Sequence, residues 1–390
     1  MNANIDEALQ VLKRLHPRKI DLSLGRILAV LDALGNPQNK LPPAVHIAGT
    51  NGKGSTTAFL RAMAQAQGLR VHVYTSPHLV AFNERIVVAS EIIGDDALAG
   101  VLAQVTQAND GAPLTFFEAT TAAAFLAFSQ SPADLAIIEV GLGGRYDATN
   151  VITPALSIIT PIDYDHAEFL GRDLAKIARE KAGIMKRQTP VITARQSELV
   201  GAVLRSEAQK TGAKLSAYNE DFRAYISQGR LVFEDDNQLM DLPLPSLIGS
   251  HQIENAGVAV AAAKALLISD KAIGRGLTGA RWPARMQKLT AGPLAKTAHD
   301  NGSQLWLDGG HNRHAALAIA ASLADLEAQD PRPLILIMGI LANKDAGGYL
   351  DALEGLAGGL VAVPIEGHAS LAPPILTELA RTRGMETDRA

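Results

Sequence analysis

The stretch "HIAGTNGKGSTT", His46–Thr57, decides the fold class because it joins a short apolar run to a helical run through three glycines. A strand, a glycine-rich loop and a helix that opens with lysine and hydroxyl residues are typical of phosphate-binding α/β proteins. The spacing departs from the Walker A motif G-x-x-x-x-G-K-[ST]. Gly54 separates Lys53 from Ser55, and position 47 is Ile instead of Gly.

The loop has the chemistry of a polyphosphate site. Backbone N–H groups of a glycine turn can point at phosphate oxygens, and the following helix adds its positive end. Lys53 can reach the β and γ oxygens, and Ser55 or Thr56 offers a hydroxyl to a magnesium ion. The alternative is a purely structural glycine turn. We expect a nucleotide to be held by Gly49, Thr50, Asn51, Gly52, Lys53, Gly54, Ser55 and Thr56.

Bulk properties narrow the class of protein. The 390 residues exceed the roughly 250–300 at which one core stops growing, so two domains are expected. Hydrophobic residues make up 47%, charged residues 19%, and the net charge of −4 gives no basic face for nucleic acid. Without cysteine there are no disulfides and no thiolate metal site. The N-terminal "MNANIDEALQVLKRLH" has no apolar signal core and no apolar run reaches about 18 residues, so we expect a soluble, cytoplasmic protein without a membrane partner. We also expect a monomer.

The order of the segments predicts the fold. Short β-branched runs alternate with helical stretches in the first half, which indicates a parallel sheet covered on both faces. Two alternating runs around Gln228-Gly229 predict a hairpin in a small β appendage. Beyond "RWPAR" come three more strand–helix pairs. We expect an α/β protein: a P-loop-type, mostly parallel sheet domain with the appendage at 1–287, and a smaller Rossmann-like α/β domain at 288–390.

Polar groups follow successive strands of the first domain, at the sheet edge where ligands bind in open α/β folds. Glu139 ends the apolar strand "LAIIEV", where an ionised carboxylate is costly unless it is paired or binds metal. It is therefore a candidate Walker-B-like magnesium ligand instead of a solvated edge residue. His166, in "DYDHAEFLG", is a second candidate, although a lone histidine is as often structural.

Lys181 continues an apolar helical stripe formed by Leu174, Ile177 and Ala178. Desolvation lowers the pKa of a buried lysine by up to about 3–5 units. The neutral amine can add carbon dioxide to form a carbamate, which is an oxygen ligand for a hard cation such as magnesium. The alternative, which spacing alone favours, is a snorkelling lysine at a helix end.

Several motifs together carry a family resemblance. "AGTNGKGST", "YTSPHLVAFNERI", "TFFEATTAAAF", "EVGLGGRYDATN", "DHAEFLGRDLAKIAREKAGI", "GSHQIENA", "RWPAR" and "LDGGHN" resemble, in order, the folylpolyglutamate synthase and dihydrofolate synthase family of the Mur ligase superfamily. The match spans nearly the whole chain. The resemblance implies an ATP-dependent amide ligase in which an acceptor carboxylate is phosphorylated and the amine of L-glutamate attacks the acyl phosphate. It implies dihydropteroate and folates as acceptors.

The resemblance also implies roles for single residues. Ser55 and Glu139 would hold one Mg²⁺, and His166 with carbamylated Lys181 a second. Asn255, Arg285 and Asp308 would contact ATP, with His311 near the phosphates; Lys53, His166, Lys181 and His311 are the catalytic candidates. The acceptor residues would be Leu24, Ser76, His78, Arg85, Thr115, Phe116, Phe117, Asp147 and Ala148.

Within that acceptor set, Phe117 or Phe116 would stack on the pterin, Asp147 would accept its N–H groups, and Leu24 would close the pocket. The alternative is that both phenylalanines are core residues and Asp147 caps a turn.

The chain departs from the family pattern at a few positions. Gly310 stands where Ala is usual, Arg313 where Pro is usual, and Ala284 where Gly is usual, but the expected polar ligands are present. The sequence ends at "METDRA", earlier than is typical, as in a shortened member or a truncated product. Three alternatives remain: a monofunctional folylpolyglutamate synthase; a cell-wall Mur ligase, which needs a further domain before the loop; and a non-catalytic ATP-binding switch protein, which would tolerate loss of a metal ligand.

Overall fold

The computed structural model describes residues 23–367 and 369–389. The N-terminal "MNANIDEALQVLKRLH" lies outside this range. The described chain divides into two compact units. The first consists of the chain up to Ser246 together with Ile253–Arg281, and the second of Leu247–Gln252 together with the chain from Trp282 onward. The sequence predicted a domain boundary near residue 288; along the chain, the last segment of the first unit ends at Arg281 and the second unit continues from Trp282.

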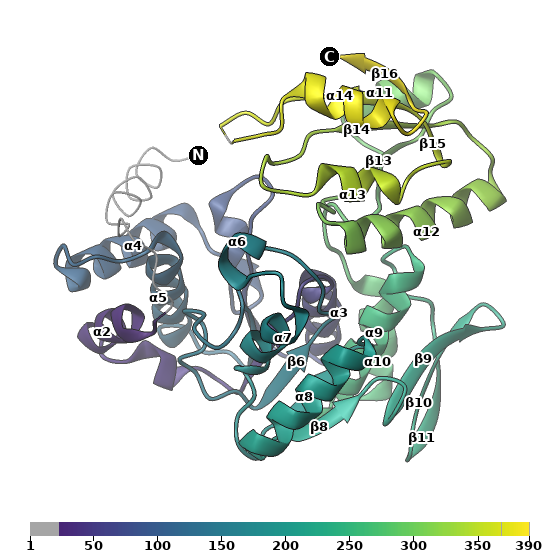
Figure 1. Ribbon diagram of the computed structural model, residues 1–390. Coiled ribbons are helices and arrows are strands. Elements are labelled where there is room, and N and C mark those ends of the chain that lie inside the picture. Colours follow the sequence, from purple (N-terminus) through teal and green to yellow (C-terminus); the bar gives the residue numbers. More distant parts are fainter. Residues whose placement is uncertain (1–22, 368, 390) are drawn as a thin grey trace. The chain divides into compact units, whose positions relative to one another are not determined.

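One large sheet organises the first unit (Figure 1). Among the described residues it has eight strands in the order β4-β3-β2-β5-β1-β6-β7-β8. Strands β2, β5, β1, β6, β7 and β8 run parallel, and β3 and β4 form an antiparallel edge. Strands β1 and β5 are buried along their whole length, as expected for a parallel sheet covered on both faces. The strands are β1 Ala44–Ala48, β2 Val71–Tyr74, β3 Ile86–Val88, β4 Glu91–Ile92, β5 Leu135–Glu139, β6 Leu156–Ile159, β7 Pro190–Thr193 and β8 Lys214–Ala217.

Helices bury the sheet through two separate apolar clusters. One cluster joins α2, α4 and α5 to residues of the sheet, and the other joins α7 and α8 to it. Helix α3, which begins at the glycine loop, packs along α10. The helices are α2 Gly25–Ala33, α3 Lys53–Ala66, α4 Asp95–Asn109, α5 Phe116–Ser129, α6 Ala167–Leu170, α7 Leu174–Ala182, α8 Glu198–Thr211, α9 Ser250–Ala265 and α10 Asp270–Gly279.

The predicted hairpin is confirmed. Strands β9 (Phe222–Ser227) and β10 (Arg230–Asp235) pair antiparallel around Gln228-Gly229. Both turn residues have positive φ, 50° and 73°, the pattern of the primed turns that suit two-residue hairpins. A third strand that was not predicted, β11 (Gln238–Leu242), completes the appendage.

The second unit has the strand–helix alternation expected from the sequence, but its strands form two small sheets. β12 and β13 pair antiparallel, and β14, β15 and β16 are parallel. The final "METDRA" contributes β16. The elements are β12 Gln287–Leu289, α11 Pro293–Asp300, β13 Leu305–Leu307, α12 Arg313–Gln329, β14 Leu334–Met338, α13 Ala346–Asp351, β15 Ala357–Ala362, α14 Pro373–Arg381 and β16 Glu386–Arg389.

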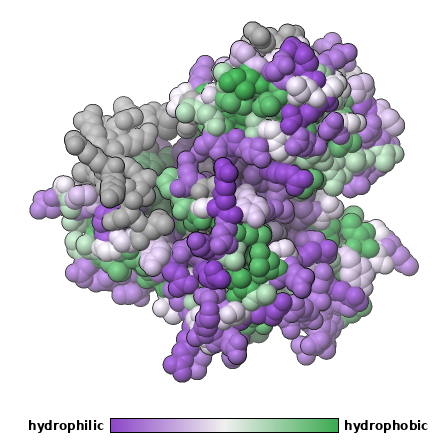
Figure 2. Space-filling model, in the orientation of Figure 1, coloured by the Kyte–Doolittle hydropathy of each residue, from purple (hydrophilic) through white to green (hydrophobic). Residues whose placement is uncertain are grey.

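The surface is of mixed polarity. On the face in Figure 2, hydrophobic residues form separate patches among hydrophilic ones. Exposed apolar residues are ordinary on the surface of folded proteins. Within the described residues, none of the helices combines the length and the apolar character needed to cross a membrane.

Candidate active site

The glycine loop between β1 and α3 is shaped by its neighbours. Gly49 has φ +153°, and a Cβ there would collide with the side chain of Thr160. Gly52 has φ +86°, and a Cβ there would lie 2.5 Å from Oδ1 of Asn255. Both the left-handed backbone and the close approach require glycine. The glycine positions that distinguish this loop from a Walker A motif are therefore required by the residues that pack against it.

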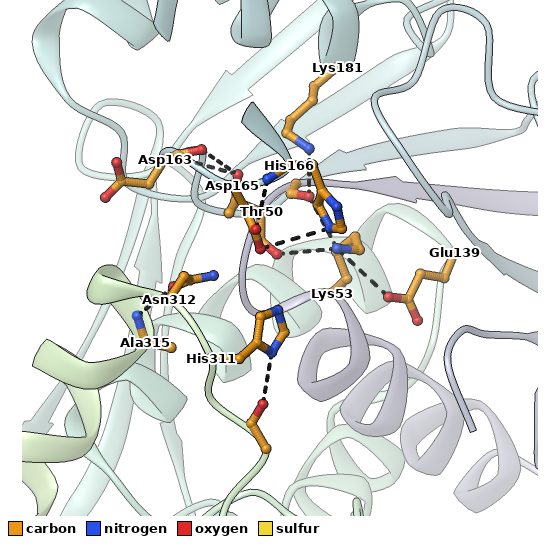
Figure 3. A network of polar contacts seen from close by, with 12 residues as sticks. Thr50, Lys53, Glu139, Asp163, Asp165, His166, Lys181, His311, Asn312 and Ala315 are labelled. Atoms are coloured by element: carbon orange, nitrogen blue, oxygen red, sulfur yellow. Dashed lines mark hydrogen bonds and ion pairs between the residues drawn. The ribbon is translucent and has the colours of Figure 1, made fainter. Parts of the chain in front are cut away.

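Lys53 lies over the loop and faces the end of β5. Its Nζ donates to the carbonyl oxygens of Gly49 and Thr50, each at 3.2 Å, and lies 3.9 Å from Oε1 of Glu139 (Figure 3). Glu139 is only 5% exposed. The ammonium group offsets part of the cost of burying this carboxylate. The two residues that the sequence assigned to phosphate and metal are thus neighbours.

The first turn of α3 carries buried hydroxyl groups. Ser55 and Thr56 are buried, and Oγ1 of Thr56 has no hydrogen-bond partner among the described residues. A buried hydroxyl without a partner is unfavourable, so this position suits a ligand oxygen or a hard cation. No group of three or more His, Cys, Asp or Glu side chains within the described residues could hold a metal alone. Hydroxyl and carboxylate oxygens fit magnesium if phosphate oxygens or waters supply the remaining ligands.

Lys181 on α7 is buried, as its place on the apolar stripe predicts. It is 5% exposed, and its Nζ donates to the carbonyl oxygen of Gly49 at 2.9 Å. Burial, together with the positive charge of Lys53, lowers the pKa of Lys181 to about 7, whereas the charges of Asp165 and Asp147 act in the opposite direction. The alternative of a snorkelling lysine is therefore wrong, because the amine ends inside the protein.

His166 lies between β6 and α6, near the same loop. Oγ1 of Thr50 donates to the carbonyl oxygen of Asp163 at 2.9 Å, which ties the segment that precedes His166 to the glycine loop. The side chain of His166 is 42% exposed, with Nε2 3.9 Å from Oδ2 of Asp165. Figure 3 shows Lys53, Glu139, His166 and Lys181 around the loop.

Phe116 and Phe117, the two candidates for stacking on a pterin, are the first two residues of α5. Thr115 caps this helix, since its hydroxyl accepts from the backbone N–H of Glu118 at 3.1 Å. The ring of Phe117 lies against Gly141, and the ring of Phe116 makes an edge contact with Phe82 at 5.9 Å between centroids. Both phenylalanines are only partly buried. The rings therefore rest on the core without being enclosed by it.

Asp147 organises the loop that follows β5. Its Oδ2 accepts from the backbone N–H of Leu142 at 2.8 Å, and its Oδ1 accepts from the backbone N–H and the hydroxyl of Thr149, at 3.0 and 2.5 Å. Burial raises the pKa of Asp147, and these hydrogen bonds oppose the rise. This loop-capping geometry is the alternative that the sequence left open for Asp147. Sequence reasoning did not single out Thr149 or its buried partner His46.

The remaining acceptor candidates lie in the same unit. Nε of Arg85 donates to Nδ1 of His78 at 2.8 Å, and the guanidinium group lies 5.2 Å from the centroid of Phe82. Ser76 precedes a cis proline in the same segment. Leu24, Phe116, Phe117 and Ala148 all belong to or pack on the cluster of α2, α4 and α5.

The second unit holds the other nucleotide candidates. The carboxylate of Asp308 accepts from the backbone N–H groups of Met286 and Gly310, both at 2.7 Å. Arg285 donates from Nη1 to the carbonyl oxygen of Ala284 at 2.7 Å. Nδ1 of His311 lies 2.9 Å from the carbonyl oxygen of Gly309. Arg285, Asp308 and His311 are thus gathered on neighbouring segments of this unit, whereas Asn255 lies in the first unit.

Comparison with known proteins gives consistent matches. Residues 47–263 match the model of the Mur ligase middle domain. The folylpolyglutamate synthase of Lacticaseibacillus casei is 35% identical over 367 residues, which cover 89% of this chain and 82% of that protein.

Solved structures are similar over the whole chain. The structure of E. coli FolC in complex with DHPP and ADP has a TM-score of 0.88 and 32% identity, and covers 100% of this chain and 89% of that one. A bifunctional folylpolyglutamate synthase/dihydrofolate synthase with Mn, AMPPNP and L-glutamate bound has a TM-score of 0.85 and 30% identity, with coverages of 100% and 90%. Nucleotides and a divalent metal are thus bound in structures similar to this chain.

Proposed function

We propose that this chain, which belongs to the folylpolyglutamate synthase/dihydrofolate synthase family of Mur ligases, joins L-glutamate to dihydropteroate and to the glutamate tail of folates, with cleavage of ATP. The observation that carries the proposal is the group of Lys53, Glu139 and Lys181 around one glycine loop at the carboxyl edge of the sheet. A glycine turn with a purely structural role would not require two lysine side chains directed at the loop and a buried carboxylate beside them.

The chemistry has two steps. An oxygen of the acceptor carboxylate attacks the γ-phosphorus of ATP, and the bond to the ADP oxygen breaks to leave an acyl phosphate. The amine of glutamate then attacks the acyl carbon, loses a proton, and phosphate leaves. Crowding of negative charge is the main obstacle in the first step. Lys53, already beside the loop, exchanges carbonyl partners for phosphate oxygens and stabilises that charge.

We propose two magnesium sites, with the ligands that the family resemblance implies. The first uses the hydroxyl of Ser55 and the carboxylate of Glu139, and the second uses His166 and a carbamate on Lys181. When bound, the metal ions neutralise phosphate charge. The carboxylate of Glu139 lies 3.9 Å from Nζ of Lys53 and would supply an oxygen ligand.

The surroundings of Lys181 support its carbamylation. The neutral amine adds to carbon dioxide and releases one proton, which leaves an anionic carbamate. Burial lowers the pKa of Lys181 to about 7, which makes the neutral amine accessible near neutral pH. The nearby charge of Lys53 favours the carbamate anion, and the charges of Asp165 and Asp147 oppose it.

The acceptor is proposed to lie between the first turn of α5 and the loop after β5. Phe116 or Phe117 provides the flat apolar contact for a pterin, and Asp147 with Ala148 shapes the facing loop. Leu24, Ser76, His78, Arg85 and Thr115 complete the candidate set. The nucleotide contacts of Asn255, Arg285, Asp308 and His311, a cytoplasmic location and a monomeric state stay predictions from the sequence.

One relative favours a narrower function. The L. casei protein, 35% identical, is called a folylpolyglutamate synthase alone, so a monofunctional enzyme is the second candidate. Both are tested by incubating the chain with ATP, Mg²⁺ and L-glutamate, and with dihydropteroate or tetrahydrofolate as acceptor. Phosphate release and the mass of the product are measured. We expect a glutamyl amide with either acceptor. Products from tetrahydrofolate alone would leave the monofunctional candidate, and no product with any folate acceptor would refute the proposal.

A further inference from the structure

A buried chain of hydrogen bonds runs from the central strand to the loop after β5. His46 lies in the middle of β1, Thr149 lies in the loop, and both are fully buried. Nε2 of His46 lies 2.8 Å from Oγ1 of Thr149, and the same hydroxyl lies 2.5 Å from Oδ1 of Asp147. This hydrogen-bond chain includes none of the residues assigned to ATP or metal.

The carboxylate of Asp147, at the end of the hydrogen-bond chain, determines which group donates in each hydrogen bond. A carboxylate oxygen only accepts, so the hydroxyl of Thr149 donates its proton to Asp147. That hydroxyl has no second proton, and Nε2 of His46 must therefore be the donor in the first hydrogen bond. Nδ1 of His46 is then unprotonated, and it has no partner among the described residues. Burial, with a contribution from the charge of Lys186, lowers the pKa of His46 to about 3, so the ring is neutral near neutral pH.

The hydrogen-bond chain ends at Asp147 in the loop Gly141–Asn150. Asp147 receives the backbone N–H groups of Leu142 and Thr149, near both ends of this loop. At one end of the loop, Gly141 lies against the ring of Phe117. The loop therefore contacts the ring of Phe117, and the position of this contact depends on how firmly the carboxylate of Asp147 is held.

We infer that His46 is a positioning residue for acceptor binding: by directing the hydroxyl of Thr149 at Asp147, it fixes the loop Gly141–Asn150 against Phe117. The inference rests on the proposed function, because it takes this loop to be part of the acceptor site. His46 does not contact the substrate. It holds the carboxylate from the rigid centre of the sheet, through a hydrogen-bond chain shielded from water.

Matched substitutions separate the hydrogen bond from packing. In His46→Gln the amide nitrogen can take the place of Nε2, whereas in His46→Asn it can reach only the place of Nδ1. In Thr149→Val the hydroxyl is lost with little change of shape, and Thr149→Ser keeps it. We expect His46→Asn and Thr149→Val to raise the KM for dihydropteroate about tenfold, on the scale of one lost buried hydrogen bond. The KM for ATP should stay within about twofold, and His46→Gln and Thr149→Ser should stay near wild type.

A second buried histidine provides the control. His72 in β2 is also fully buried, but it is bound by the carbonyl oxygen of Ser131 and the backbone N–H of Ala89. His72→Asn should lower the thermal midpoint without a selective change in the KM for dihydropteroate. The inference is overturned if His46→Asn and Thr149→Val leave that KM unchanged, or if they raise the KM for ATP equally.

A measurement without turnover separates this inference from the proposed function. With ¹⁵N-labelled histidine, NMR of the wild-type chain should show His46, assigned by its loss in His46→Gln, with a protonated Nε2 and a bare Nδ1. A protonated Nδ1 with bare Nε2 would overturn the inference even in an active enzyme. The expected tautomer in a chain that ligates glutamate to no folate acceptor would support the hydrogen-bond chain and contradict the proposed function alone.

Discussion

Lys181 and Lys53 donate to the same carbonyl oxygen, that of Gly49, at 2.9 and 3.2 Å. Two ammonium groups so close repel each other, and the buried one is the easier to neutralise. This agrees with the lowered pKa of Lys181, about 7. A carbamate on Lys181 would replace the repulsion with attraction to Lys53, so the arrangement favours the modification that the proposed second metal site needs.

Lys181→Ala should therefore abolish ligation, because both the carbamate oxygens and the buried amine are lost. Short carboxylates at high concentration should restore part of the activity by supplying the missing oxygens. Turnover of dihydropteroate is the measurement, and Lys176→Ala, which removes an exposed lysine of the same helix, is the control. Full activity of Lys181→Ala without added carboxylate would refute the assignment of the second metal site.

Gly144→Ala should displace Lys181 without touching its side chain. A Cβ at Gly144 would lie 2.7 Å from the carbonyl oxygen of Glu180 and 3.0 Å from Cα of Lys181, so the end of α7 must move. Misplacement of a catalytic group by about 1 Å can cost roughly a hundredfold in rate. We expect kcat to fall at least tenfold. Gly100→Ala, in a helix with open space around it, should leave kcat unchanged, and equal kcat values for the two variants would contradict this coupling.

The buried His46 should make stability depend on pH. Its pKa is lowered from 6.5 to about 3 in the folded chain, so the unfolded chain binds more protons between these values. Stability from this group is complete above about pH 6.5 and falls as the pH falls towards 3. In urea unfolding from pH 6 to pH 4, His46→Gln should reduce the slope by about 1.4 kcal/mol per pH unit relative to wild type. The control His299→Gln changes a side chain that is 91% exposed and should keep the wild-type slope. An unchanged slope in His46→Gln would show that the folded chain already protonates this ring.

Ala284 has a strained backbone. Its φ is 54°, in the left-handed region where a Cβ costs about 1–2 kcal/mol, so glycine would adopt this conformation with less strain. Ala284→Gly should raise the thermal midpoint of the second unit by a few degrees in calorimetry. A lower midpoint would mean that the buried methyl group contributes more than the strain removes.

The sequence was most informative where local pattern and buried chemistry coincide. The parallel strands around the glycine loop, the hairpin at Gln228-Gly229 and the buried stripe that ends at Lys181 all have a local periodic or turn signal. The antiparallel edge strand β4 has two residues and carries too little pattern to predict.

The hydrogen-bond chain from His46 could not be found from the sequence, because its members are 103 residues apart and only the sheet brings them together. Only the hydrogen bonds from Thr149 to Asp147, two residues apart, join residues that are close in the sequence. The role of Asp147 also depends on partners that only the folded loop provides.

The central claim is that the chain activates an acceptor carboxylate as an acyl phosphate and passes it to glutamate. The most direct test uses dihydropteroate labelled with ¹⁸O in its carboxylate, together with ATP, Mg²⁺ and L-glutamate, and mass spectrometry of the phosphate released. The account predicts one ¹⁸O atom in each phosphate and a glutamyl amide in equal amount. Glutamyl amide accompanied by unlabelled phosphate would contradict it.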